Sequence, residues 1–210
     1  MHRLMLLFGL VLAGDAALAT AQTSYTPPPI GTQLTWSDNS GGEGQTRVSE
    51  VVATGPDFAI HLYNLGWDNT RPSSYFAEFS GVHIASCSSV MPSQQERDSL
   101  RTLWPLQNGK TTTLDGLVST TYEVGFAEEY TISQSEGPTV SYRITSKIGE
   151  REAAVVISSA LNTVVEMAWS DGSKVQAIDV FRKASTRADD TLKQSLGLCG
   201  ALLDLSLIHI

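Results

Sequence analysis

Short segments in which hydrophobic and polar residues alternate follow one another along most of this chain. In the segment 58–63, for example, Phe58, Ile60 and Leu62 share one face, whereas His61 and Tyr63 share the other. Alternation with a period of two is typical of β-strands that bury one face. We therefore expect strands through most of the chain from residue 34 onward.

The later segments alternate in the same way. Tyr122, Val124 and Phe126 are expected on one face of a strand. A further strand ends at Trp169, where Ser170-Asp171-Gly172 is a strong hairpin signal. Because Trp104 and Trp169 both occupy apolar faces, core packing is the expected role of these two rings.

Two helices are predicted among the strands. Ser93 followed by Glu96 three residues later has the spacing of a capping box, which predicts a helix that begins after Ser93 and ends before Pro105. The second helix is expected to begin near Asp189, with its apolar face formed by Leu192, Leu196, Cys199 and Leu203.

About nine strands and two helices predict a mainly β (β-rich α+β) fold. Sheets of many strands curl, so we expect a curved antiparallel meander or half-barrel with a helix over its concave face. In outline this architecture resembles the half-barrel carriers of the bacterial envelope and the lipocalin-like barrels, although the Gly-x-Trp signature of lipocalins is absent.

Residues 1–21 are predicted to form a secretory signal peptide. Arg3 provides the basic start, an apolar run covers residues 4–13, and small residues allow cleavage after Ala19 or Ala21. The run is too short to span a bilayer, and no later segment is long enough to do so. The sequence therefore predicts a soluble periplasmic or extracellular protein, without an integral membrane segment after cleavage.

The rest of the chain divides into an extended lead-in over residues 22–33, which contains three consecutive prolines, and a single β-rich domain over residues 34–204. Residues 205–210, Leu-Ser-Leu-Ile-His-Ile, are identical to one reading frame of a transposon-end adapter used in short-read sequencing. We interpret these six residues as an adapter artefact, which implies a truncated C-terminus.

Charge and cysteine content narrow the functional classes. The formal net charge of -8 makes the protein acidic and disfavours binding to nucleic acid or to anionic membrane surfaces. The two cysteines, Cys87 and Cys199, are predicted to form a disulfide, because a pair of cysteines in an exported chain is usually oxidised. Loop closure over about 110 residues contributes about 4–5 kcal/mol in the chain-entropy model.

No motif of a known reaction is present, so no catalytic residue and no cofactor are predicted. Of the histidines outside the terminal segments, His61 and His83 lie on predicted strands. Together with a carboxylate such as Asp57 or Glu78 they could in principle hold a metal ion. Their spacing matches no zinc-binding motif, however, and no metal site is predicted. The candidate ligand-binding residues are Trp67, which lies in a predicted loop, His61 and Tyr63.

The function predicted from these observations is non-catalytic binding of a small apolar ligand or of an envelope partner protein. Two alternatives stay open. One is a secreted hydrolase that uses His61 or His83, which requires a hydroxyl and a carboxylate within hydrogen-bond reach of the histidine. The other is a structural or assembly protein of the cell envelope, which requires an exposed apolar patch or an unpaired strand edge.

Overall fold

The structure is a computed structural model, which describes residues 24–39, 44–64, 74–116, 119–133, 137–182 and 196–206. The expected signal peptide, the candidate residue Trp67 and the last four residues lie outside these ranges.

Eleven antiparallel strands form one sheet, in the order β5-β4-β3-β2-β1-β11-β10-β9-β8-β7-β6. The strands are β1 (Thr32–Asp38), β2 (Gln45–Gly55), β3 (Phe58–Asn64), β4 (Ser74–Phe79), β5 (His83–Ser86), β6 (Thr111–Asp115), β7 (Ser119–Thr131), β8 (Pro138–Ile148), β9 (Arg151–Ser158), β10 (Thr163–Trp169) and β11 (Lys174–Arg182). The helices are α1 (Gln94–Arg101), the short 3₁₀ helix η1 (Gly197–Cys199) and α3 (Gly200–Ser206).

The predicted mainly β, curved antiparallel meander with two helices is confirmed. The sheet curls into a ring but stays open, because its edge strands β5 and β6 are not paired with each other. The strands number eleven rather than about nine, in part because the segment from Tyr75 to Ser86 divides in two. Ser80 and Gly81, both with positive φ, turn the chain between β4 and β5.

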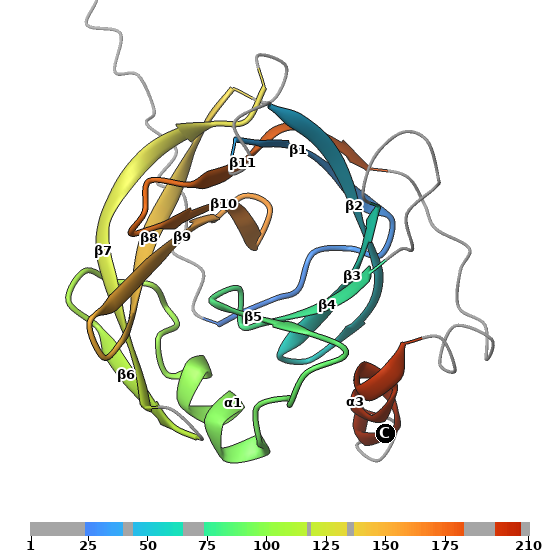
Figure 1. Ribbon diagram of the computed structural model, residues 1–210, viewed down its shortest axis with the longest axis vertical. Helices are drawn as coiled ribbons and strands as arrows, with labels where there is room; N and C mark the ends of the chain where they lie inside the picture. Colours follow the sequence, from blue (N-terminus) through green and yellow to red (C-terminus); the bar gives the residue numbers. More distant parts are fainter. Residues whose placement is uncertain are drawn as a thin grey trace, which may run out of the picture.

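The sheet is rolled, so that the β5 edge lies inside the ring (Figure 1). One face of β4 and β5 therefore looks toward β10, where Glu78 accepts a hydrogen bond from the Thr163 hydroxyl. The opposite face looks toward β7, where the Nδ1 of His83 lies 2.6 Å from the Tyr122 hydroxyl. Because both faces of these two strands are covered, the roll buries side chains that an open sheet would expose.

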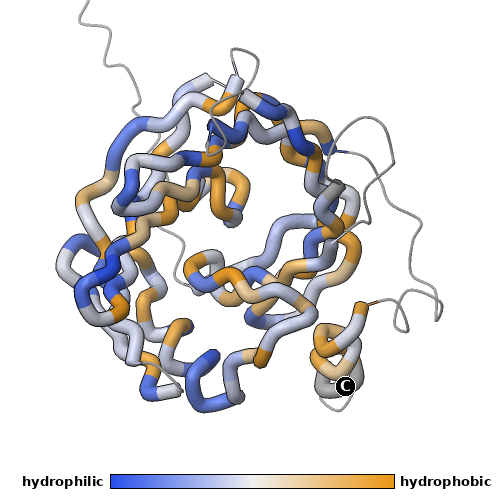
Figure 2. Tube along the Cα trace, in the orientation of Figure 1, coloured by the Kyte–Doolittle hydropathy of each residue, from blue (hydrophilic) through white to orange (hydrophobic). Residues whose placement is uncertain are grey.

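Apolar side chains fill the interior of this roll. Figure 2 shows hydrophobic stretches on the strands inside the ring and on α3. The burial of β1 alternates residue by residue, as a period-two strand requires. The largest fully buried side chains are Phe79, Leu34, Ile60, Leu100, Leu103 and Ile144.

Helix α1 begins as the sequence predicts. The Ser93 hydroxyl accepts a hydrogen bond from the Glu96 amide, and the Glu96 carboxylate accepts one from the Ser93 amide, which completes the capping box. The helix contacts β6 and is tied to the β2–β3 turn by a buried ion pair of 3.2 Å between Arg97 Nε and Asp57 Oδ2. The Arg97 guanidinium also lies over the Phe79 ring, 6.0 Å from its centroid.

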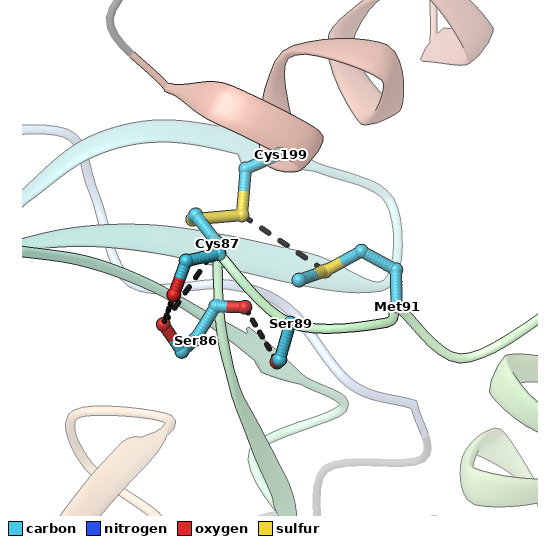
Figure 3. The surroundings of a disulfide bond; sticks show 6 residues. Ser86, Cys87, Ser89, Met91 and Cys199 are labelled. Carbon is cyan, nitrogen blue, oxygen red and sulfur yellow. Dashed lines mark hydrogen bonds between the residues drawn. A yellow bond between two sulfur atoms is a disulfide. The ribbon is translucent and has the colours of Figure 1, made fainter. Parts of the chain in front are cut away.

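The predicted Cys87–Cys199 disulfide is present and joins the chain after β5 to the C-terminal helical segment (Figure 3). The Leu198 amide donates a hydrogen bond to the Cys87 carbonyl at 3.0 Å. Gly197 has a φ of +57°, and a Cβ there would lie 3.0 Å from the same carbonyl oxygen. Glycine is therefore the residue that lets the two segments approach this closely.

The structure describes only the last part of the predicted C-terminal helix. The predicted start near Asp189 lies outside the described residues, and Gly197 interrupts a helical path because its φ is positive. The helix proper, α3, begins at Gly200. It contacts β2 from outside the ring (Figure 1).

Two side chains do not lie where the sequence predicts them. Trp169, the last residue of β10, is 42% exposed instead of packed in the core. The β7–β8 register shifts between Val124 and Ala127, so Phe126 leaves the face of Tyr122 and Val124 and is 77% exposed. An extra residue in one strand reverses the alternation beyond it, and simple periodicity does not reveal such a residue.

Candidate functional site

A cavity of about 270 Å³ opens on the concave side of the sheet, between β1–β5 and β10–β11. Its wall on β10 and β11 is entirely apolar and is formed by Val164, Met167, Trp169 and Val175. Pockets that hold drug-sized ligands usually measure about 300–1,000 Å³, so this cavity suits a small molecule.

The opposite wall, on β2, β3 and β4, carries most of the polar side chains of the lining. It presents Arg47, Ser49, His61 and Glu78 to the cavity. The pairs Arg47 and Ser49, and His61 and Tyr63, are each two residues apart, and alternate residues of a strand face the same side. The strand pattern thus places one polar row opposite an apolar surface.

Aromatic rings complete the lining. Trp36, Tyr63 and Phe76 contact the cavity together with Trp169. The Trp36 indole N–H donates a hydrogen bond to the Ser49 hydroxyl at 2.8 Å, and the rings of Tyr63 and Phe76 meet edge to face at 5.8 Å. These contacts fix the rings, which are therefore organised before any ligand arrives.

The cavity has a mouth and a floor. At the mouth, where the strands end, Trp169 is 42% exposed, and the carboxylate of Asp38 forms an ion pair of 2.7 Å with Arg47. At the floor, Glu78 and Val164 are almost fully buried. Glu78 Oε2 accepts hydrogen bonds from the Thr163 hydroxyl at 2.7 Å and the Val164 amide at 3.3 Å, and these bonds close the floor across the roll.

Two titratable side chains meet at this floor. The Nε2 atom of His61 lies 3.5 Å from Glu78 Oε2. Burial lowers the pKa of His61 to about 4, and burial raises the pKa of Glu78 to about 7 against the two hydrogen bonds that Glu78 accepts. At neutral pH the histidine is uncharged, and it does not supply the positive charge that the carboxylate would need.

Both members of this pair retain hydrogen-bonding capacity. The buried atoms His61 Nε2 and Glu78 Oε1 make no hydrogen bond. Buried polar atoms are normally satisfied, so these two unsatisfied atoms set the floor apart from the rest of the interior. The floor is therefore the chemically distinctive part of the cavity.

The second histidine lies apart from this site. The His83 imidazole is bonded to the Tyr122 hydroxyl on the other face of the β4–β5 hairpin, and burial lowers the pKa of His83. Among the described residues, the partner shown for His61 is a glutamate and the partner shown for His83 is a tyrosine. Neither of these two partners is a serine.

The structure therefore brings two of the three candidate ligand-binding residues, His61 and Tyr63, to one cavity, whereas Trp67 lies outside the described residues. Trp36, Arg47 and Trp169 also line the cavity, and they were not among the candidate ligand-binding residues chosen from the sequence. For Trp36 the signal was available, because it alternates with Asp38 on one face of its strand.

A second hollow, of about 350 Å³, lies beside the C-terminal end of α1 and is lined in part by Tyr25, Trp104, Asp98 and Arg101. The charged ends of Asp98 and Arg101 are each more than half exposed and pair with each other at 3.5 Å. This hollow is a feature of the surface, and the concave cavity is the candidate site.

In the described part of the chain, no group of three or more His, Cys, Asp or Glu side chains is arranged to hold a metal ion. Nor does any helix of that part have the length and apolarity needed to cross a membrane. Comparison of the chain with protein-family models and with curated proteins gives no match.

Proposed function

We propose that this protein is an exported binding protein that holds a small, largely apolar ligand in the concave cavity without transforming it. The observation that carries this proposal is the cavity itself, in which an unbroken apolar wall of four residues faces preorganised aromatic rings. Concave, mostly apolar sites with a few fixed polar groups are the usual form of small-molecule sites.

Export is part of the proposal. It is supported by the signal-peptide pattern of residues 1–21 and by the Cys87–Cys199 disulfide, since such bonds persist in oxidising compartments. N-terminal sequencing of protein recovered from an exporting host should give a chain that begins at Thr20 or Gln22. Recovery of the uncleaved chain in the cytoplasm would contradict this part.

Ligand binding can be tested by filling the cavity. Val175 lines it, whereas Ile178 on the same strand is 40% exposed and does not. Val175→Phe should occupy the volume that a ligand needs, and Ile178→Phe adds a similar ring on the other side of β11 as the matched control.

The assay is a tryptophan-fluorescence titration with two small neutral probes, ethylbenzene and 2-phenylethanol. We expect saturable one-to-one binding to the wild-type protein, at least about tenfold weaker binding to Val175→Phe, and little change in Ile178→Phe. Circular dichroism checks that both variants fold. The proposal fails if neither probe and neither the amine nor the carboxylate analogue of 2-phenylethanol binds saturably, or if a folded Val175→Phe protein binds as well as the wild type.

A further inference from the structure

The charges around the cavity restrict what the polar end of a ligand can be. Among the described lining residues, Asp38 and Glu78 are acidic and Arg47 is basic. The positive charge of Arg47 is already paired, because its guanidinium lies 2.7 Å from the Asp38 carboxylate, although its Nε atom makes no hydrogen bond. The described lining therefore holds no cation without a carboxylate partner.

Glu78 is in the opposite position. Its neighbour His61 is neutral, because burial lowers the pKa of that imidazole to about 4. The other partners of Glu78 are the neutral Thr163 hydroxyl and Val164 amide, and both bind Oε2. Among the described residues, Oε1 has no hydrogen-bond donor and no cation pairs with the carboxylate at the floor.

The rest of the lining suits a positively charged group. Four aromatic side chains, Trp36, Tyr63, Phe76 and Trp169, surround the same space. The faces of aromatic rings attract cations, and tryptophan does so most strongly. A buried carboxylate together with several aromatic rings is a combination that recognises organic ammonium groups.

We infer that the ligand of this cavity is a small organic amine, whose ammonium group binds at the Glu78 end of the floor and whose apolar body packs against the β10–β11 wall. The inference rests on the proposed function and makes it specific. The ammonium group supplies the hydrogen-bond donor that Glu78 Oε1 lacks and the countercharge that His61 does not provide. A neutral ligand of the same shape supplies no countercharge, and a carboxylate adds a second negative charge beside Glu78.

A matched series of ligands separates these cases. We choose 2-phenylethylamine, 2-phenylethanol and phenylacetate, which share a ring and differ in the charge of the polar end. Affinities are measured by calorimetry at pH 8, where Glu78, with its pKa of about 7, is mostly ionised. The wild-type protein should bind the amine at least about tenfold more tightly than the alcohol, and phenylacetate most weakly.

Glu78→Gln removes the charge and keeps an oxygen that can accept from Thr163 and Val164. It should bring the affinities for the amine and the alcohol to within about threefold of each other. Glu50→Gln is the control, because Glu50 bonds Gln33 on the strand face opposite Ser49, and the ratio should stay at the wild-type value.

The outcomes distinguish the two proposals. The amine inference is overturned if the wild-type protein binds the amine and the alcohol equally well, or if it prefers phenylacetate. In both cases the proposed function, ligand binding in the cavity, still holds. An unchanged ratio in a folded Glu78→Gln protein also overturns the amine inference. If no member of the series binds, the proposed function itself fails. The wild-type comparison decides the matter even if Glu78→Gln does not fold.

Discussion

Replacing Glu78 by glutamine should make the stability of this protein rise with pH between about 4 and 6.5. The reason is that two buried groups at the cavity floor have opposite effects. The folded-state pKa of Glu78 is raised from 4.5 to about 7, so the folded state holds a proton that the unfolded chain releases. The pKa of His61 is lowered from 6.5 to about 4, so here the unfolded chain holds the extra proton.

The sign and size of each contribution follow from proton linkage. Stability rises with pH where the unfolded state binds more protons and falls where the folded state does. At 1.36 kcal/mol per pH unit, the contribution of Glu78 to the free energy of unfolding falls by about 3 kcal/mol as pH rises from 4.5 to 7. The His61 contribution grows by about 3 kcal/mol as pH rises from 4 to 6.5. In the wild-type protein the two nearly cancel across the range that they share.

Single variants expose each contribution. Urea unfolding, followed by tryptophan fluorescence at a series of pH values, gives the free energy of unfolding of each protein. Relative to wild type, Glu78→Gln should become more stable with rising pH by about 3 kcal/mol, and His61→Gln should become less stable by a similar amount. The double variant should lie parallel to wild type. A difference between Glu78→Gln and wild type that does not change with pH would refute the reasoning.

Two further predictions concern the anchors of the helices. Removing the disulfide with Cys87→Ala and Cys199→Ala should lower the free energy of unfolding by about 4–5 kcal/mol, because it frees a loop of 112 residues in the unfolded chain; an unchanged urea midpoint would contradict this. Arg97→Leu should cost about 3–5 kcal/mol, since it leaves the buried Asp57 carboxylate unpaired, whereas Arg101→Leu on the exposed side of the same helix should cost less than about 1 kcal/mol. Equal costs for these two arginine variants would show that the buried pair has no special role.

The strands and the first helix could be predicted because their signals are local. The limits of β3 match the expected segment 58–63 closely, and the capping box at Ser93 and Glu96 is present as predicted. The pairing of Cys87 with Cys199 followed from the presence of only two cysteines in a chain with an export signal.

Two side-chain positions could not be predicted, for different reasons. Phe126 is exposed because a bulge precedes it and shifts the face of the residues that follow, whereas Trp169 is exposed because it is the last residue of β10, at the mouth of the cavity. In the described C-terminal segment, Gly197 interrupts the helical path before Gly200, since its backbone turns to reach Cys87. That turn depends on a segment distant in the sequence.

The cavity floor was hidden from the sequence for a similar reason. Alternation correctly placed His61 and Tyr63 on one face, but the contact between Glu78 and Thr163 joins residues 85 positions apart. It exists only because the sheet rolls its β5 edge inward against β10 (Figure 1). No local pattern reveals which strand meets which across such a roll.

The most direct test of ligand binding in the cavity is an NMR titration that observes the tryptophan indole N–H groups while 2-phenylethylamine is added. Trp36 and Trp169 line the cavity, whereas the indole of Trp104 donates to the Ser80 carbonyl at 2.8 Å and does not line it. We predict that the Trp36 and Trp169 signals shift to saturation with one dissociation constant, while the Trp104 signal does not move. Signals from Trp36 and Trp169 that stay in place throughout the titration, or that move no more than the Trp104 signal, would contradict the account.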